Sequence, residues 1–296
     1  MLEIHPKEIS TKDLHGYLLG SVGPRPIALA STVDKEGRPN LSPYSFFNVF
    51  SVNPPIAILS ASRRVRNNTT KHTLENIKST KEVVINVVSY DIVEQTSLSS
   101  TEYKEGVNEF IKSGFTTLKS DIVKPYRVKE SPVQMECLVK DIIALGDEGG
   151  AGNLVMCEIV KIHISKNILN AQDQIDPNKI DLVGRMGANF YCRASNNALF
   201  EVQKPSSKLG IGFDQLPEHV RNSSILSGND LAKLANIECL PHLEEVAKFK
   251  ENIDIAKILN TTSNNLETRA KLHHHCKSLL LENKLLEAWN TLLIEN

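Results

Sequence analysis

Residues 25–62, "RPIALASTVDKEGRPNLSPYSFFNVFSVNPPIAILSAS", alternate apolar runs of strand length with turn signals. The charged stretch "DKEGRPN", which contains Gly37 and Pro39, predicts a turn, so residues 26–33 and 41–52 are expected to form a hairpin. Two prolines open "PPIAILSAS", a position that a strand tolerates, and this run is expected to return antiparallel to "SPYSFFNVF". The stretch therefore predicts antiparallel β structure in which small polar side chains interrupt buried strands.

Further strand signals follow along the first half of the chain. The run 82–90 is short, β-branched and bounded by charge, and the runs 133–146 and 154–166 flank the glycine-rich loop "DEGGAGN" as a second hairpin. Helices are expected in this half over residues 71–80 and 93–114. Many short strands joined by turns predict an antiparallel barrel or sandwich.

The pattern changes near the C-terminal third, where Leu, Ile and Ala take helical spacing. Helices are expected over three runs, residues 229–237, 241–250 and 266–296. Asn229 or Asp230 is the expected cap of the first helix, and Pro241 is expected to open the second. We therefore predict two domains, a β-rich domain over residues 1–204 and a helical C-terminal region over residues 205–296.

Composition and charge narrow the range of partners. The chain has 296 residues, a formal net charge of -1 and a pI near 6.8, whereas proteins dedicated to nucleic acids or anionic membranes carry an excess of Lys and Arg. No apolar run reaches the roughly 20 residues that span a bilayer, and "MLEIHPKEIS" lacks the layout of a signal peptide. We expect a cytoplasmic protein with no nucleic-acid or membrane partner. The cysteines form no Cys-x-x-Cys pair that would indicate zinc or dithiol chemistry.

The segment "SASRRVRNNTTKHTLENI", residues 60–77, has the composition of an anion site. Its hydroxyl groups and cations precede an expected helix and are Ser60, Ser62, Arg63, Arg64, Arg66, Thr69, Thr70, Lys71 and Thr73. Hydroxyls, guanidinium groups and the free N–H groups of a helix start all donate hydrogen bonds, and the helix dipole adds positive potential, which is how a phosphate is held. The alternative is that Thr70 or Thr73 only caps the helix while the arginines lie in solvent.

The stretch "SPYSFFNVFS" sets aromatic rings among small polar side chains, and its members are Tyr44, Ser45, Phe46, Phe47, Asn48, Phe50 and Ser51. Such a set offers an aromatic wall with polar groups that reach the edge of a flat heterocycle. The alternative is a core strand with two satisfied polar residues. Pairing with residues 54–62 would bring the anion segment beside the aromatic wall, where a planar ring with a phosphate tail fits. That geometry suits flavin mononucleotide (FMN).

The sequence resembles the flavin reductase-like FMN-binding split-barrel family in five successive blocks, residues 25–62, 71–89, 108–139, 154–164 and 181–195. The resemblance covers about residues 10–200. It implies a mainly β fold, a split β-barrel with Greek-key connections, to which the α-helical C-terminal region is appended. It also implies a homodimer, with FMN, or alternatively FAD, bound near the subunit interface.

Carried over residue by residue, the resemblance implies two groups of flavin contacts. Those that border the isoalloxazine ring are Ser45, Phe46, Phe47 and Asn48. Those that hold the ribityl phosphate are Ser60, Ala61, Ser62, Arg63, Lys71 and Thr73. His72 departs from the family pattern, which has an acid between the lysine and the threonine.

Three further side chains have two interpretations each. Arg25 and Arg185, the latter beside two glycines that permit close backbone approach, are candidate contacts to flavin or to a partner subunit, or else surface arginines that pack their stems. His163 lies in a run with alternate apolar residues and is either a core or rim histidine or a proton donor to flavin. Consecutive residues of a helix point about 100° apart, so the histidines 273–275 do not converge on one metal ion.

The leading hypothesis is an FMN-binding oxidoreductase, an NAD(P)H-dependent flavin reductase in which hydride passes from nicotinamide to flavin. No Gly-x-Gly-x-x-Gly fingerprint is present, so nicotinamide is expected to stack on the flavin and not to bind a Rossmann domain. The alternative is an FMN-binding electron carrier or redox sensor without its own NAD(P)H turnover, whose helical C-terminal region docks a protein electron acceptor. The two hypotheses differ in whether NAD(P)H alone reduces the bound flavin.

Overall fold

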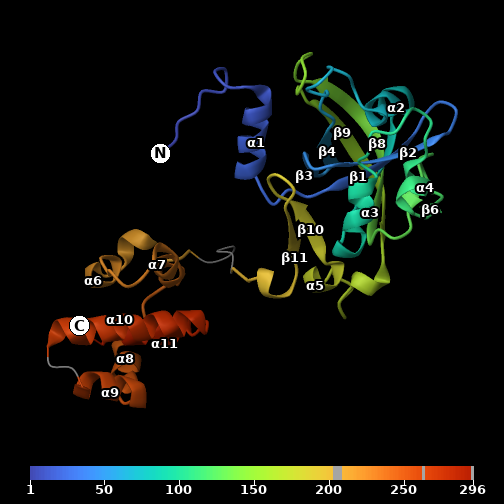
Figure 1. Ribbon diagram of the computed structural model, residues 1–296. Coiled ribbons are helices and arrows are strands. Elements are labelled where there is room, and N and C mark those ends of the chain that lie inside the picture. The colour runs from blue at the N-terminus through green and yellow to red at the C-terminus, as the bar shows by residue number, and fades with distance from the viewer. Residues whose placement is uncertain (203–208, 262–263, 295–296) are drawn as a thin grey trace. The chain divides into compact units, whose positions relative to one another are not determined.

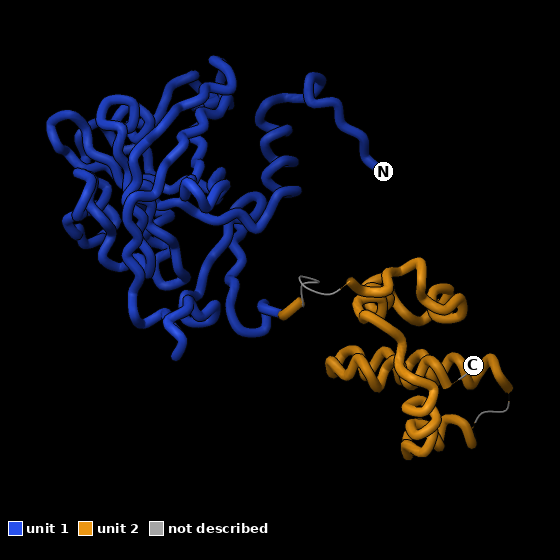
Figure 2. Tube along the Cα trace, turned by 180° about the vertical axis from the view of Figure 1, so that it is seen from behind, with its two compact units in different colours: residues 1–200 blue, residues 201–296 orange. Residues whose placement is uncertain are grey.

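The computed structural model describes residues 1–202, 209–261 and 264–294. The chain divides into two compact units, Met1–Phe200 and Glu201–Asn296, which Figure 2 shows in separate colours. The boundary expected from the sequence, between residues 204 and 205, lies outside the described residues.

The first unit is built on one antiparallel sheet of seven strands in the order β2-β1-β5-β8-β9-β4-β3 (Figure 1). The strands are β1 (Ala28–Val33), β2 (Pro39–Tyr44), β3 (Phe47–Val52), β4 (Pro55–Ser60), β5 (Glu82–Val87), β8 (Val133–Ala144) and β9 (Asn153–Ile164). Two short ribbons accompany the sheet, β6 (Thr117–Leu118) with β7 (Arg127–Val128) and β10 (Leu182–Arg185) with β11 (Tyr191–Ala194). β2 and β3 form the two edges and do not pair with each other, so the sheet is not closed into a barrel.

The strand pairs confirm the antiparallel pairings expected from the sequence. β1 pairs with β2 around the turn at Gly37, whose φ of +82° suits glycine, and β3 pairs with β4 and β8 with β9. The expectation of one strand over residues 41–52 was wrong, because β2 ends at Tyr44 and β3 begins at Phe47 on the opposite edge of the sheet. Pro43 removes a hydrogen-bond donor from β2, which suits an edge strand.

Short helices connect the strands of the first unit. They are α1 (Thr11–Ser21), α2 (His72–Thr80), η1 (Tyr90–Ile92), α3 (Val93–Leu98), α4 (Glu109–Ser113), η2 (Lys166–Ile168), α5 (Pro177–Ile180) and η3 (Asn196–Ala198). The single helix expected over residues 93–114 is instead α3 and α4, separated by residues 99–108. Ser99 Oγ donates to Thr96 O at 2.8 Å and Ser100 Oγ to Ser97 O at 2.6 Å, and such local bonds end the helix early.

The helix α2 is anchored by its apolar face. Leu74 and Ile77 are fully buried in the same core cluster as Ala28 of β1 and Tyr44 of β2. Burial of each such side chain contributes about 1.5–3 kcal/mol. The start of α2 is thereby held against β2, the strand that carries several of the polar residues described below.

The second unit is helical, as expected, with η4 (Phe213–Gln215), α6 (Glu218–Arg221), α7 (Gly228–Ala235), α8 (Leu243–Phe249), α9 (Ile253–Thr261), α10 (Asn265–Leu281) and α11 (Leu285–Leu293). Ser227 caps α7, correcting the expectation of Asn229 or Asp230, because Ser227 and Asp230 form a reciprocal capping box. Trp289 is buried and its Nε1 donates to Leu234 O at 3.0 Å. The unit has an apolar core of its own.

The helical content corrects the prediction that the fold is mainly β, because the chain has mixed α and β content.

Pro241 does not open a helix, since α8 begins at Leu243 with His242 as its N-cap. In the histidine run, His273 is buried and its Nδ1 lies 2.7 Å from Ser223 Oγ. Of the helices in the described ranges, none combines the length and hydropathy needed to cross a bilayer.

Candidate functional site

The start of β3 and the end of β4 bring the aromatic stretch next to the anion segment. Ser60 N donates to Phe46 O at 2.8 Å, where the two strands begin to pair. Phe46 is 41% exposed and Asn48 is also exposed, whereas Ser45 and Phe47 are half-buried. Tyr44 belongs to the core, but the rest of the stretch is not a core strand, as its alternative interpretation held, because Phe46 and Asn48 border solvent beside Ser60.

The chain after β4 is held against the loop between β8 and β9. Ala61 N donates to Asn153 O at 3.1 Å, and Asn153 Nδ2 donates back to Ala61 O at 2.9 Å. Gly152 lies so close that a Cβ on it would be 2.6 Å from Ser60 Oγ, so any larger residue here would force Ser60 to shift. The backbone and the side chain of Asn153 thus fix the segment that carries Ser60 and Ser62, which are both half-buried.

Lys71 is a half-buried ammonium group that forms no ion pair with the acidic side chains of the described residues. It is the N-cap residue of α2. Its Nζ lies 3.5 Å from Ser42 Oγ and 5.0 Å from the ring centre of Tyr44. Burial, and then the neighbouring Arg64, lower the pKa of Lys71. A cation placed in this way favours the binding of an anion.

Thr73 and Tyr44 line the same region with buried hydroxyl groups. Thr73 Oγ1 accepts a hydrogen bond from Asn40 Nδ2 at 2.8 Å. The Tyr44 hydroxyl borders Thr73 and Ser42 but makes no hydrogen bond of acceptable geometry within the described chain, and burial raises its pKa to about 12. Neither Thr70 nor Thr73 caps α2, which has no side-chain cap hydrogen bond, so the capping interpretation was wrong.

A polar cavity of about 30 Å³ opens beside Lys71. Its lining residues come from β2, the start of α2 and the segment after α3, and are Asn40, Ser42, Arg64, Lys71, His72, Thr73, Ser99, Ser100, Thr101, Glu102, Tyr103 and Glu109. Arg64 lines the cavity, whereas Arg63 does not and donates its Nε to Asn68 Oδ1 at 2.6 Å inside its own loop. The structure therefore brings Lys71 and Thr73 together with Arg64 at one cavity.

Several residues of this cavity were missed by the sequence analysis, among them Asn40, Glu102 and Glu109. Glu109 is 5% exposed, its Oε2 accepts the N–H of Leu41 at 3.1 Å, and burial raises the pKa of its carboxyl group. The run "SLSST", residues 97–101, is the one signal that points to the segment after α3, because so many adjacent hydroxyl groups are unusual inside an expected helix.

The model of the flavin reductase like domain family matches residues 20–178, more than half of the chain. The chain belongs to this family. A protein of Aquifex aeolicus strain VF5 is 34% identical over 201 residues, which are 68% of this chain and 100% of that protein. The matched family region lies within the first unit.

Two solved structures are similar to the flavin reductase-like domain. Nitrilotriacetate monooxygenase component B from Bacillus cereus is 27% identical with a TM-score of 0.64, over 68% of this chain and 98% of that one. A flavin reductase-type protein with a split barrel domain, from Shewanella frigidimarina, is 25% identical with a TM-score of 0.58, over 69% of this chain and 100% of that one. The domain thus has the split-barrel type of fold, with its sheet open between β2 and β3.

Arg25 of the flavin reductase-like domain is buried, so its interpretation as a surface arginine was wrong. Its side chain is 6% exposed, and its guanidinium donates to Leu19 O at 2.7 Å, to Val22 O and to Met186 O at 2.9 Å. Burial, and then Arg185, lower the pKa of Arg25. These bonds tie the end of α1 to the turn after β10.

Arg185 lies directly beside Arg25, because the backbones of the two residues form a β-bridge. Its Nη1 donates to Phe190 O at 3.1 Å, and its guanidinium lies 4.6 Å from the ring centre of Tyr191. The side chain is half-buried. The structure therefore joins the two arginines predicted as candidate contacts, but gives them different surroundings.

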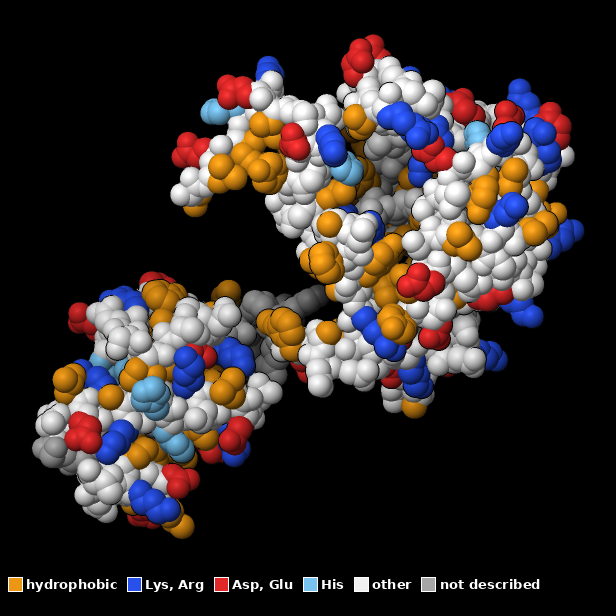
Figure 3. Space-filling model, in the orientation of Figure 1, with side chains coloured by type: hydrophobic (Ala, Val, Ile, Leu, Met, Phe, Trp, Pro, Cys, Tyr) orange, Lys and Arg blue, Asp and Glu red, His pale blue; other side chains and the backbone are white. Residues whose placement is uncertain are grey.

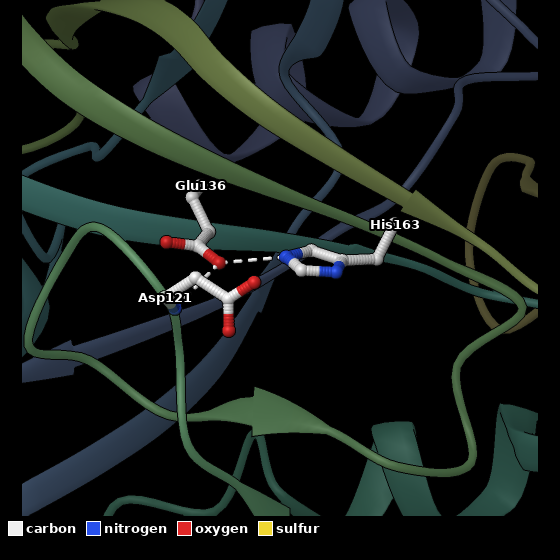
Figure 4. A group of neighbouring side chains, drawn as sticks. All are labelled: Asp121, Glu136 and His163. Carbon is white, nitrogen blue, oxygen red and sulfur yellow. Dashed lines mark hydrogen bonds and ion pairs between the residues drawn. The ribbon is translucent and has the colours of Figure 1, made fainter.

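A separate polar group surrounds Glu136 on β8 (Figure 4). His163 Nε2 lies 2.6 Å from Glu136 Oε1, and the two Glu136 oxygens also accept the N–H groups of Asp121, Ile122 and Val123 at 2.9, 2.7 and 3.1 Å. Burial by itself raises the pKa of Glu136, but these hydrogen bonds outweigh it and lower the pKa to about 2. The carboxylate thus holds the loop after β6 against the sheet.

The ligand atoms of Asp121, Glu136 and His163 lie within 4.8 Å of one another, a separation that also suits a metal ion. Lys161 Nζ, however, pairs with Asp121 Oδ2 at 2.5 Å, and both Glu136 oxygens are already used. A metal ion would have to displace the lysine and several hydrogen bonds. We assign the group to structure, and the His163 ring, directed at Glu136 in Figure 4, favours the rim interpretation over that of a proton donor to flavin.

Proposed function

We propose that the flavin reductase-like domain binds FMN and catalyses the reduction of flavin by NAD(P)H. The observation that carries the proposal is the hydrogen bond between Ser60 N and Phe46 O, at 2.8 Å. It joins the aromatic stretch to the segment that leads to Lys71, which supports a surface for a flat ring next to a site for a phosphate. FAD is the alternative flavin.

The proposed contacts fall into the two groups expected from the family. The ring is bordered by Ser45, Phe46, Phe47 and Asn48, and the phosphate-binding segment contains Ser60, Ala61, Ser62, Arg63, Lys71 and Thr73. The Lys71 ammonium without an ion pair and the Tyr44 hydroxyl without a hydrogen bond support an anion in this place, because buried polar groups otherwise find partners. Arg185 is proposed as a contact to flavin or to a partner subunit.

FMN, when bound, supplies the chemistry of hydride acceptance and donation. The chain's part is to hold the ring and the phosphate while leaving one side open to the nicotinamide. The exposure of Phe46 and Asn48 supports such access from solvent. In this proposal none of the chain's side chains needs to act as a nucleophile.

We also propose that the domain forms a homodimer in which β3 is covered. Val49, Phe50 and Val52 are 50%, 65% and 86% exposed, and β3 is an edge strand of the sheet. An exposed apolar edge favours association with another chain. Figure 3 shows hydrophobic side chains gathered on the hollowed face of residues 1–200. Sedimentation equilibrium at micromolar concentration checks this, and a monomer there contradicts the proposal.

The test of the function is anaerobic stopped-flow absorbance of the full-length protein, loaded with FMN and mixed with NADH or, separately, with NADPH. We expect rapid bleaching of the flavin band with one nucleotide, which also identifies the electron donor. Bound flavin that stays oxidised with both nucleotides would contradict the reductase and support an electron carrier or redox sensor that docks a protein partner. Failure to bind any flavin would contradict both.

A further inference from the structure

The segment between α3 and α4 brings one carboxylate to the cations of the anion site. Glu102 Oε1 lies 3.0 Å from Arg64 Nε, and Glu102 Oε2 pairs with Arg66 Nη2. The Arg64 side chain is 20% exposed, against 71% for Arg66, so Arg64 is the more enclosed of the two cations. The Arg64 guanidinium also donates to Thr70 O, just before α2.

Arg64 is placed where a phosphate in the proposed site would meet it. It lines the polar cavity together with Lys71 and Thr73. Arg63, its neighbour in sequence, is instead engaged by Asn68, through Nε at 2.6 Å and through Nη2 to the backbone oxygen at 2.7 Å. Of these two adjacent arginines, Arg64 is the one that lines the cavity, and its guanidinium also donates to Thr69 Oγ1 at 3.0 Å.

Glu102 already occupies part of the hydrogen-bonding capacity of Arg64. A carboxylate and a phosphate both accept from a guanidinium group, and two anions at one guanidinium repel each other. The Glu102 side chain is 45% exposed, and ion pairs with such exposed carboxylates are weak. A phosphate that contacts Arg64 and Lys71 together has the larger interaction and displaces the carboxylate.

We propose that Arg64 is the principal arginine for the flavin phosphate, and that Glu102 is an internal carboxylate which the phosphate replaces at Arg64. The inference rests on the proposed function. Glu102 thereby lowers the affinity for phosphorylated flavin and leaves the affinity for riboflavin unchanged. It is a residue that sets ligand specificity by acting through Arg64.

The first test is the titration of full-length protein with FMN and with riboflavin, followed by quenching of flavin fluorescence. Arg64→Ala is expected to weaken FMN about 10- to 100-fold, the range for charge-assisted hydrogen bonds, and to change riboflavin less than about twofold. Arg38→Ala is the control, with an expected loss of less than about threefold, because the Arg38 guanidinium pairs with Asp34 at 2.5 Å and does not line the cavity. Arg64→Lys keeps the positive charge but lacks the planar set of N–H donors of a guanidinium group, so its loss of FMN affinity is expected to be smaller than that of Arg64→Ala. It replaces the alanine variant in the test if that variant does not fold.

The second test removes the competing carboxylate. Glu102→Gln is expected to tighten FMN about two- to fivefold, the effect of one exposed ion pair, with riboflavin unchanged. Glu105→Gln is the control in the same segment, because Glu105 is 78% exposed and lies 3.9 Å from Arg38, away from the cavity. In the Arg64→Ala background the gain from Glu102→Gln is expected to disappear.

The outcomes separate the inference from the function on which it rests. A wild-type protein that binds neither FMN nor riboflavin overturns the proposed function. FMN binding that is indifferent to Arg64→Ala overturns the inference alone. A Glu102→Gln variant with weaker FMN binding also overturns it, because Glu102 would then hold Arg64 in place and not compete with the phosphate.

Discussion

The first unit contains two polar clusters built from similar residue types but completed in opposite ways. Around Glu136, each carboxylate oxygen is saturated by His163 or by the backbone of residues 121–123. Around Lys71, the ammonium group forms no ion pair within the described chain, and the neighbouring Tyr44 hydroxyl forms no hydrogen bond. The first cluster is complete without a ligand, and the second is not.

The difference indicates that the Glu136 cluster stabilises the fold, whereas the Lys71 cluster serves ligand binding. A buried charge whose partners are all supplied by the chain stabilises the folded state only while every partner remains. A buried cation without a partner costs folding free energy, and that cost is recovered when an anion binds. We therefore expect changes at Glu136 to alter stability and changes at Lys71 to alter ligand binding.

The largest effect is expected from Glu136→Ala. The substitution leaves three backbone N–H groups and the His163 ring without their acceptor, so we expect the free energy of unfolding to fall by about 3–5 kcal/mol. Chemical denaturation followed by circular dichroism measures this loss. Asp121→Asn is the control, because Asp121 is 47% exposed and its pair with Lys161 contributes about 1 kcal/mol or less. Equal losses of unfolding free energy for the two variants would contradict the stabilising role of the Glu136 carboxylate.

Acid is expected to weaken the same cluster by a smaller amount, because a protonated carboxyl group retains part of its hydrogen bonding. The pKa of Glu136 is lowered from 4.5 to about 2 in the folded protein. Its contribution is therefore complete above about pH 4.5 and is lost as the pH falls toward 2. Denaturation midpoints measured across this range check the slope. Glu136→Gln, which has no titrating group there, is expected to show a shallower dependence.

Lys71→Ala is expected to weaken FMN by about 1.5–3 kcal/mol while riboflavin changes little, because only FMN carries the phosphate. The free energy of unfolding is expected to stay constant or to rise, since the substitution removes a half-buried charge that forms no ion pair with the described residues. Isothermal titration calorimetry and denaturation measure the two quantities. Lys78→Ala, on the same helix but paired with Glu75, is the control. Equal weakening of FMN and riboflavin would remove Lys71 from the phosphate site.

The smallest effect is expected from Gly152→Ala. Its Cβ would lie 2.6 Å from Ser60 Oγ, so the serine must leave its present rotamer, at a cost of about 0.5–1.5 kcal/mol. FMN binding is expected to weaken less than in Lys71→Ala. Gly16→Ala in α1 has no atom within 4 Å of the added Cβ and is expected to stabilise the protein by up to about 1 kcal/mol. Thermal unfolding of both variants distinguishes the opposite signs.

Local patterns in the sequence were sufficient to predict much of the fold. The turn at Gly37, the hairpin of β8 and β9 and the helix α2 each follow from residues adjacent along the chain, and the structure contains all three. The order of the sequence blocks was also sufficient to assign the family, which the match over residues 20–178 confirms. Alternation of side chains, turn chemistry and residue spacing are properties of the sequence itself, so these elements were predictable.

Only the tertiary structure decided which polar groups have partners. Residues 41–52 divide between opposite edges of the sheet, which the apolar pattern does not show. Of the two adjacent arginines, Arg63 is engaged by Asn68 in its own loop, whereas Arg64 lines the cavity and also meets Glu102, 38 residues away. In the sequence Glu136 and Lys71 are simply two charged residues. In the fold, distant partners saturate the Glu136 carboxylate, whereas the Lys71 ammonium forms no ion pair with the described residues. Partners that are distant along the chain meet only after folding, so a complete cluster and an incomplete one are not distinguishable from the sequence alone.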